Sequence, residues 1–259
     1  MTTLANGTTG TDATSFTDKV RDKIDLIVTP AFFVVMASAV GAMWVYSDFD
    51  STVERILSTE RLVDNVIAHV SMTLWSTVFV VGLAVPLGIF LTRPAYRRFA
   101  PPILAFANSG QAIPAFGLLV LFAGAFGTGQ RTAIYAFTVF ALLPVLRNTM
   151  VGLQQVDQSV IDAGRGMGLS KRQALFRIEL PLSVPVILAG IRTALVINVG
   201  MATLGFLISA GGLGEPIGAG LQLRRDEAVF IAGGMVAALA LLVDFVAALA
   251  VRYLRPKGL

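Results

Sequence analysis

The chain has 259 residues, of which 55% are hydrophobic and only 14% are charged. Ordinary soluble domains carry about 25% charged residues, so this composition indicates a polytopic protein with one membrane domain. The absence of cysteine excludes disulfides, thiol catalysis and cysteine-ligated metals, and the single histidine, His69, excludes a histidine metal cluster. The net charge of +4 does not by itself indicate nucleic-acid binding.

The N-terminal part of the chain differs from the rest in composition. Residues 1–18 are rich in Thr, Ser, Gly and Asp, with almost nothing to bury, and are expected to form a disordered tail. Residues 19–62 are expected to hold one transmembrane helix and an external loop, and residues 63–259 the main transmembrane domain. His69 lies in an apolar run of that domain, where a lone histidine is more typical of helix packing than of a ligand.

The predicted fold class is all-α, because the apolar runs are long enough to cross a bilayer as helices, which takes about 20 residues each. The third run is interrupted by Asn108, Gly110 and Pro114. Two runs contain a charge, Arg192 in the fifth and Asp244 in the sixth. The expected spans lie at residues 27–46, 66–91, within 99–126, and at 132–146, 184–208 and 228–251.

The positive charges are distributed unevenly over the connections between these spans. Most of the 20 lysines and arginines lie before span one, after spans two and four, and after span six. With six spans, all of these regions are on one side of the membrane, which the positive-inside rule assigns to the cytoplasm. Both termini and the loop after span four are therefore predicted to be cytoplasmic, and the acidic loop 47–64 external.

The loop after span four, residues 156–185, is predicted to form two short helices. Asp157 or Ser159 can cap the first helix, and Gly166 and Gly168 can end it in a left-handed conformation.

The second helix of this loop has its own start and stop signals. Ser170 with Gln173 fits a capping box, which starts the helix. Pro181 is expected to stop it, because proline cannot continue a helical hydrogen-bond pattern.

The spacing in this loop resembles the EAA signature of ABC-importer permeases, which reads E-A-A, three residues, G, nine residues, I-x-L-P. The departures are Asp for Glu and Gly for the second Ala. The resemblance implies a cytoplasmic coupling helix, between spans four and five, that docks into a groove on a separate ATPase; the alternative is a solvated helical hairpin. The residues it assigns to ATPase coupling are Asp162, Ala163, Gly164, Arg165, Gly168, Ile178, Leu180 and Pro181.

The resemblance covers most of the chain, which is similar to permeases of osmoprotectant importers. It is carried by PLGIFLTR (86–93), AIPAFGLL (112–119), LPVLRNT (143–149), GRGMG (164–168), ELPLSVPVILAGIRTA (179–194) and AGGLGEPI (210–217). It implies an inner-membrane transport subunit for glycine betaine, choline, carnitine or a related solute. The implied partners are an ABC ATPase, an extracytoplasmic binding protein and a second permease subunit; no enzymatic activity, cofactor or metal is expected. The helix before residue 47 departs from many members of the family.

The chain has no G-x-x-x-x-G-K-[ST] loop, so it cannot hold ATP by that mechanism.

The sequence leaves three other functions open. A permease for another small solute, such as methionine, would share the same signature. An ion-coupled carrier would need an intramembrane carboxylate, for which Asp244 is the only good candidate. An intramembrane enzyme would need a catalytic constellation that is absent from the sequence.

Candidate pathway residues interrupt or lie within two of the spans. Broken membrane helices often line cavities, which makes span three a candidate. The alternative for each polar residue is interhelical hydrogen bonding. The candidates are Asn108, Gln111 and Pro114 in span three, and Asn198, Met201 and Thr203 in span five.

The two intramembrane charges are predicted to form a pair. At about 1.5 Å per residue, Arg192 lies roughly 14 Å into span five from the cytoplasmic side, and Asp244 roughly 12 Å into span six from the same side. An unpaired charge in mid-membrane costs about 2.5–3.5 kcal/mol, which favours a partner. The alternative is that Arg192 extends to the lipid headgroups and Asp244 lines water.

Overall fold

The structure is a computed structural model and describes residues 10–254, with side chains from residue 27 onward. Every regular element in this part of the chain is a helix. In chain order they are α1 (Gly10–Tyr46), α2 (Ser51–Ile56), α3 (Thr59–Thr92), η1 (Arg97–Phe99), α4 (Ala100–Ala112), α5 (Ala115–Phe126), α6 (Gln130–Gln154), α7 (Gln158–Gly166), α8 (Lys171–Ala174), η2 (Leu175–Glu179), α9 (Leu180–Ala202), η3 (Thr203–Ile208), α10 (Gly214–Leu223) and α11 (Asp226–Leu254).

The all-α membrane fold predicted from the sequence is confirmed. Five helices are long and apolar enough to span a membrane, at Ile27–Tyr46, Thr59–Thr92, Gln130–Gln154, Lys171–Ile208 and Asp226–Leu254. A sixth span results if the bent pair Arg97–Ala112 and Ala115–Phe126 is counted as one.

The N-terminal region differs from the prediction. Helix α1 begins at Gly10, so residues 10–18 are helical rather than a disordered tail. Residues 1–9 lie outside the described part.

The third predicted span is bent rather than straight, and the bend has a local cause. The two halves meet at 100° around Ile113 and Pro114. Proline disfavours the helical conformation of the residue before it, and Ile113 is extended, with φ −73° and ψ 130°. The other two predicted interruptions, Asn108 and Gly110, lie inside α4 and do not break it.

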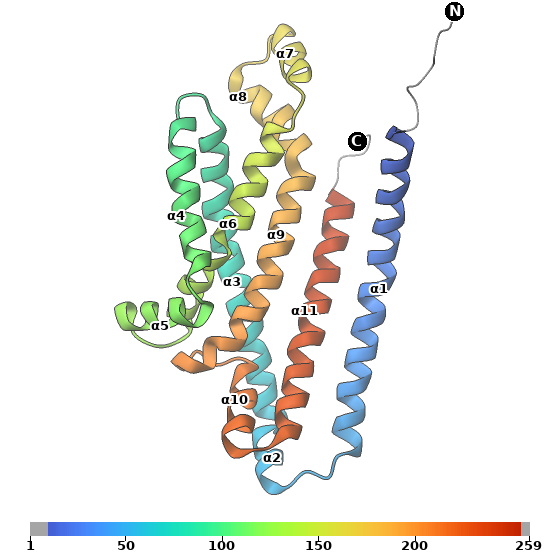
Figure 1. The fold of residues 1–259 in the computed structure, drawn as a ribbon, viewed down its shortest axis with the longest axis vertical. Coiled ribbons are helices and arrows are strands. Elements are labelled where there is room, and N and C mark those ends of the chain that lie inside the picture. The colour runs from blue at the N-terminus through green and yellow to red at the C-terminus, as the bar shows by residue number, and fades with distance from the viewer. Residues whose placement is uncertain (1–9, 255–259) are drawn as a thin grey trace, which may run out of the picture.

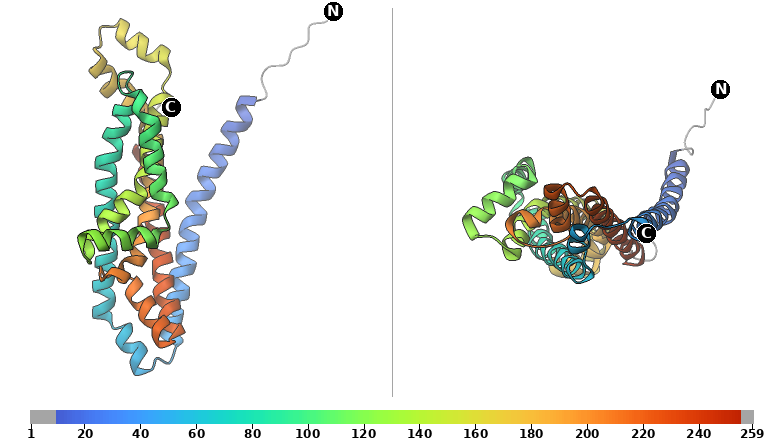
Figure 2. Two further views of the ribbon diagram at one scale, coloured as in Figure 1. Left: turned by 60° about the vertical axis from the view of Figure 1, so that its left-hand side comes forward. Right: turned by 90° about the horizontal axis from the view of Figure 1, so that it is seen from below.

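The helices form an elongated bundle with α3, α6 and α9 packed at its centre (Figure 1). Helix α4 packs on α6, and α11 packs between α9 and α1. The start of α1, the end of α11 and the α7–α8 connection all lie at one end of the bundle, and α2 and α10 lie at the other (Figure 1). Helix α1 leans away from the bundle toward Gly10 (Figure 2).

His69 connects three parts of the chain inside this bundle. The side chain is fully buried in α3. Its Nδ1 accepts a hydrogen bond from the backbone N–H of Leu213 at 3.3 Å, so Nε2 carries the proton and donates to the Val199 carbonyl at 3.0 Å. The prediction that this histidine serves helix packing is confirmed.

Glycines allow the segment after α9 to fold back closely on itself. A Cβ at Gly214 would overlap the carbonyl oxygen of Thr203, and a Cβ at Gly218 would overlap the ring of Phe206. Gly214 and Gly218 are both buried in α10. The approach of η3 to α10 therefore depends on the absence of side chains at these two positions.

Replacing Gly214 with alanine is expected to lower the thermal stability of the purified protein, because the overlap involves backbone that has little room to move. Gly200→Ala is the control: this glycine in α9 has no atom within 4 Å of the added Cβ. Alanine is about 1 kcal/mol better than glycine in a helix interior, so the control should match or exceed the wild type. Equal melting temperatures for the two variants would contradict this account of the packing.

Candidate coupling segment and intramembrane charge pair

The first helix of the segment after α6 starts and ends as the sequence predicts. Asp157 is the N-cap of α7, and its Oδ1 accepts the backbone N–H of Ser159 at 2.8 Å. This hydrogen bond holds the pKa of Asp157 below its ordinary value, since it stabilises the charged carboxylate. The helix ends at Gly166, and Gly168 has φ +94°, a conformation that side chains disfavour.

The second helix starts as predicted but does not stop where predicted. The Ser170–Gln173 capping box is formed in both directions, at 2.8 and 3.3 Å. Pro181, however, lies in the first turn of α9, and the chain continues through it without a break. The preceding turn, η2, is a π-helix, and this widening of the hydrogen-bond pattern accommodates the proline ring and its missing N–H.

Gly164 and Ile178, two positions of the signature-like spacing, contact each other. Gly164 is buried, and a Cβ at this position would overlap Cδ1 of Ile178. This contact packs α7 against η2. The departure from alanine at position 164 is therefore compensated by an isoleucine side chain that fills the vacated space.

The remaining signature-like residues divide into an exposed and a half-buried group. Asp162, Ala163, Arg165 and Gly168 are exposed, whereas Leu180 and Pro181 are half-buried. Two apolar side chains that the sequence analysis did not select also lie open to solvent, Met167 at 81% exposure and Phe176 at 60%. The segment thus presents a mixed apolar and charged surface at one end of the bundle.

An ion pair that the sequence analysis missed ties this segment to α3. Arg93 Nη2 lies 2.7 Å from Glu179 Oε2, and Glu179 is buried. Arg93 also donates to Oγ1 of Thr92 at 3.1 Å. Glu179 is the single acid between Asp162 and Glu215, which is a signal that it needs a partner. Many basic residues are predicted on the same side of the membrane, so the sequence did not indicate that Arg93 is the one that pairs with Glu179.

The two intramembrane charges face each other, as their similar depths in the membrane predict. Arg192 Nε lies 2.5 Å from Asp244 Oδ1, and Arg192 Nη2 lies 2.6 Å from Asp244 Oδ2. This is a two-pronged contact, the geometry in which an arginine binds a carboxylate most strongly. It joins α9 to α11.

The predicted pathway residues are not gathered on one surface. Asn108 and Pro114 are exposed, and Gln111 donates to the Phe140 carbonyl at 3.2 Å. Asn198 and Met201 are instead buried between helices of this chain.

Asn198 fits the alternative of interhelical hydrogen bonding. Its Nδ2 donates to Oγ1 of Thr77 at 2.9 Å, which joins α9 to α3. The buried Oδ1 of Asn198 and the buried Oγ1 of Thr203 find no hydrogen-bond partner among the described residues. Asn198 and Met201 are both covered by helix packing in this chain, and their assignment to the pathway stays a prediction.

The five or six apolar helices, the polar ties between them and the segment between α6 and α9 define a multi-span membrane protein. The chain belongs to the family described as "Binding-protein-dependent transport system inner membrane component", whose profile matches residues 84–256.

The relatives that it matches include permease proteins named for glycine betaine, carnitine, choline and osmoprotectants. It is 37% identical over 193 residues to the glycine betaine/carnitine/choline transport system permease protein OpuCB of Bacillus subtilis, covering 74% of this chain and 87% of that one. It is 38% identical over 188 residues to the osmoprotectant import permease protein OsmY of Salmonella typhimurium, covering 73% and 80%. A solved structure of the MetNI methionine ABC transporter in inward-facing conformations has a chain with a TM-score of 0.67 at 25% identity, covering 76% of this chain and 97% of that one.

Breaking the charge pair is expected to reduce the amount of folded protein in the membrane. Asp244→Ala removes the carboxylate that balances the charge of Arg192 in an apolar environment, and the combined Asp244→Arg, Arg192→Asp variant should recover part of the loss. The measurement is the monodisperse yield in detergent together with the melting temperature. Arg252→Ala, an exposed arginine on the same helix, is the control and should match the wild type. A double variant no better than the worse single variant would argue against the pairing.

Proposed function

We propose that this chain is the membrane-spanning subunit of an ATP-driven importer for glycine betaine, carnitine, choline or a related osmoprotectant. The observation that carries the proposal is the 36–38% identity to curated permeases of this class over about three quarters of the chain. The family membership and the continuous segment between α6 and α9 support the same conclusion.

The partners follow from what the chain has and lacks. It contains no phosphate-binding loop, so ATP hydrolysis is assigned to a separate ATPase. The exposed apolar residues Met167 and Phe176, beside the exposed charges of α7, suit a docking surface for that ATPase. An extracytoplasmic binding protein would deliver the solute, and a second permease subunit would complete the pathway.

The orientation is inferred from charge and architecture together. The start of α1, the end of α11 and the α7–α8 connection share one end of the bundle, and this end carries most of the basic residues (Figure 1). The positive-inside rule favours the cytoplasm for this end. The ATPase surface would then face the compartment that contains ATP.

Two other functions receive less support. The methionine transporter similarity favours another small solute, but the sequence relatives are osmoprotectant permeases at higher identity. An ion-coupled carrier needs a carboxylate that can bind and release its ion, whereas Asp244 is held by both prongs of Arg192.

The function is tested by reconstituting the chain into liposomes with its ATPase and binding protein. Radiolabelled glycine betaine, carnitine, choline and methionine are compared as solutes. We expect uptake of at least one methylated ammonium compound that requires both internal ATP and the binding protein. Uptake driven by an ion gradient without ATP, or uptake of methionine alone, would refute the proposal.

Gly168→Asp is expected to abolish this uptake while leaving the protein in the membrane. Its left-handed backbone resists a Cβ, and the new charge would lie on the exposed surface of the segment. Gly166→Asp, two residues earlier and without positive φ, separates the effect of charge from that of conformation. Normal uptake with normal ATPase co-purification in the Gly168 variant would rule out docking through this turn.

The orientation is tested with single cysteines, against a chain that has none of its own. A cysteine at Ser51, at the start of α2, should react with an impermeant thiol reagent in intact cells. A cysteine at Ser170, the N-cap of α8, should react only after permeabilisation. Labelling of position 170 in intact cells would reverse the inferred orientation.

A further inference from the structure

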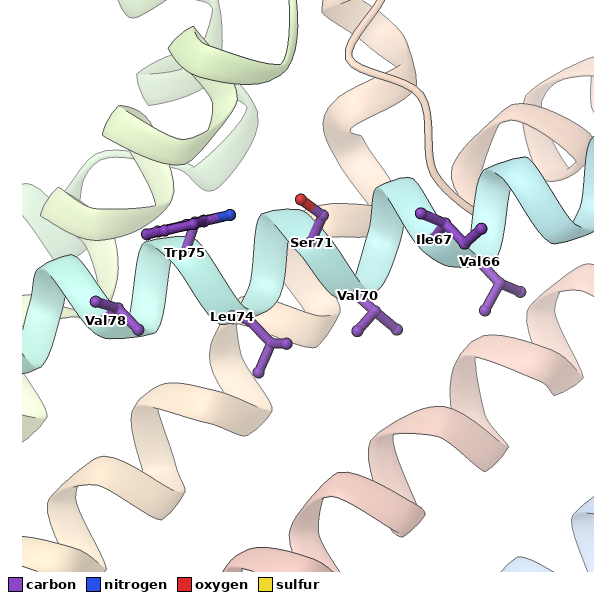
Figure 3. A pocket seen from close by; sticks show the side chains of 7 residues that line it. All are labelled: Val66, Ile67, Val70, Ser71, Leu74, Trp75 and Val78. Carbon is purple, nitrogen blue, oxygen red and sulfur yellow. The ribbon is translucent and has the colours of Figure 1, made fainter.

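A cavity of about 310 Å³ lies between α3 and the first turns of α6. Its lining combines aromatic, polar and charged side chains, namely Ser71, Trp75, Phe79, Gln130, Arg131, Ile134 and Tyr135. This volume is at the lower end of the range of small-molecule sites, about 300–1,000 Å³. Ser71 and Trp75 also line an apolar groove of about 570 Å³ along α3, so the cavity continues along that helix (Figure 3).

Three aromatic rings contribute to the cavity. Trp75 and Phe79 stand one turn apart on α3 with ring centroids 6.2 Å apart, and Tyr135 comes from α6. Their exposed fractions are 54%, 43% and 47%, so a ligand can reach all three. The other side of Tyr135 packs edge-on against Phe126, which fixes its position. Clustered aromatic faces attract methylated ammonium groups, whose charge is diffuse and weakly hydrated.

Arg131 adds a positive charge to the lining of the cavity, beside the aromatic rings. It is exposed, and it has neither an ion-pair nor a hydrogen-bond partner among the residues that the structure describes. It lies in the first turn of α6, where the helix dipole already disfavours a cation. An anion next to Arg131 would therefore be stabilised by both the guanidinium and the helix terminus. Gln130 offers a further amide donor at the same place.

We propose that this cavity binds a zwitterion that carries a methylated ammonium and a carboxylate. Trp75, Phe79 and Tyr135 receive the ammonium, and Arg131 with Gln130 receives the carboxylate. The inference deepens the proposed function and rests on it, because it places a solute site in the membrane subunit itself. Arg131 also sets a preference: it would repel a methylated cation that has no carboxylate, so glycine betaine should bind more tightly than choline.

The chain offers a direct optical test, because it contains only two tryptophans. Trp44→Phe leaves Trp75 as the sole tryptophan and keeps the aromatic contact that Trp44 makes with Phe49. The full-length variant is placed in nanodiscs of phosphatidylglycerol and phosphatidylethanolamine, so that no lipid headgroup carries a methylated ammonium. Tryptophan emission is then followed during titration with glycine betaine, choline or glycine.

We expect a saturable change with glycine betaine, a weaker one with choline and none with glycine, which lacks the methyl groups. Arg131→Gln should weaken glycine betaine binding about tenfold and leave choline binding unchanged or improved. Tyr135→Ala should weaken both ligands, whereas Tyr135→Phe keeps the ring and should bind nearly as the parent does. The Trp75→Phe variant, with Trp44 as sole tryptophan, should give no optical response.

Three results would overturn the proposal. The first is an emission that no ligand changes at millimolar concentration, which would mean that these rings only face lipid as an interfacial aromatic belt. The second is choline binding equal to or tighter than glycine betaine. The third is an equal response to glycine. Because this titration uses neither ATPase nor binding protein, its failure would leave the proposed transport function standing, and a failed uptake assay would leave a positive titration standing.

Discussion

The high cost of an unpaired charge or polar group in hydrocarbon constrains this structure throughout. A charge at the centre of a bilayer costs about 2.5–3.5 kcal/mol on insertion scales, and an unsatisfied backbone group costs several. The chain meets this constraint by joining helices through polar pairs: Arg192 with Asp244 joins α9 to α11, and Asn198 with Thr77 joins α9 to α3. Helix association in lipid gains little from hydrophobicity, so these pairs and close glycine packing determine which helices are neighbours.

These pairs also explain how far sequence reasoning could go. The similar depths of Arg192 and Asp244 favoured their pairing, because each of these two spans contains a single charge, but depth alone did not exclude that Arg192 extends to the headgroups. Arg93–Glu179 did not follow, since Glu179 lies at a membrane end where several arginines compete for it. Asn198 and Met201 illustrate a second limit: periodicity identifies a span but not which of its faces a neighbouring helix will cover. The position of the bend could be predicted from Ile113–Pro114, whereas its angle of 100° depends on tertiary packing.

The coupling-like segment was predictable where its signals were local. Caps and the glycine turn act within four residues, so Asp157, Gly168 and the Ser170–Gln173 box could be read directly. Pro181 was misread because proline is compatible with a helix when it falls in the first turn, and the π-helical turn before it places it there. The consequence is mechanical: α8, η2 and α9 form one continuous element, so a displacement of the segment passes directly into a span.

Helix α3 is tied to the same continuous element by side-chain contacts. It runs for 34 residues, about 50 Å, and is fastened to the chain of α9 at three heights. Glu179 contacts Arg93 at its C-terminal end, Asn198 contacts Thr77 near its middle, and His69, nearer its N-terminal end, donates to the Val199 carbonyl. Trp75 and Phe79 lie on the opposite, exposed face of this helix. These ties connect α3 to the continuous η2–α9 element along its length, so a movement that enters at η2 would reach the aromatic face of α3 through them.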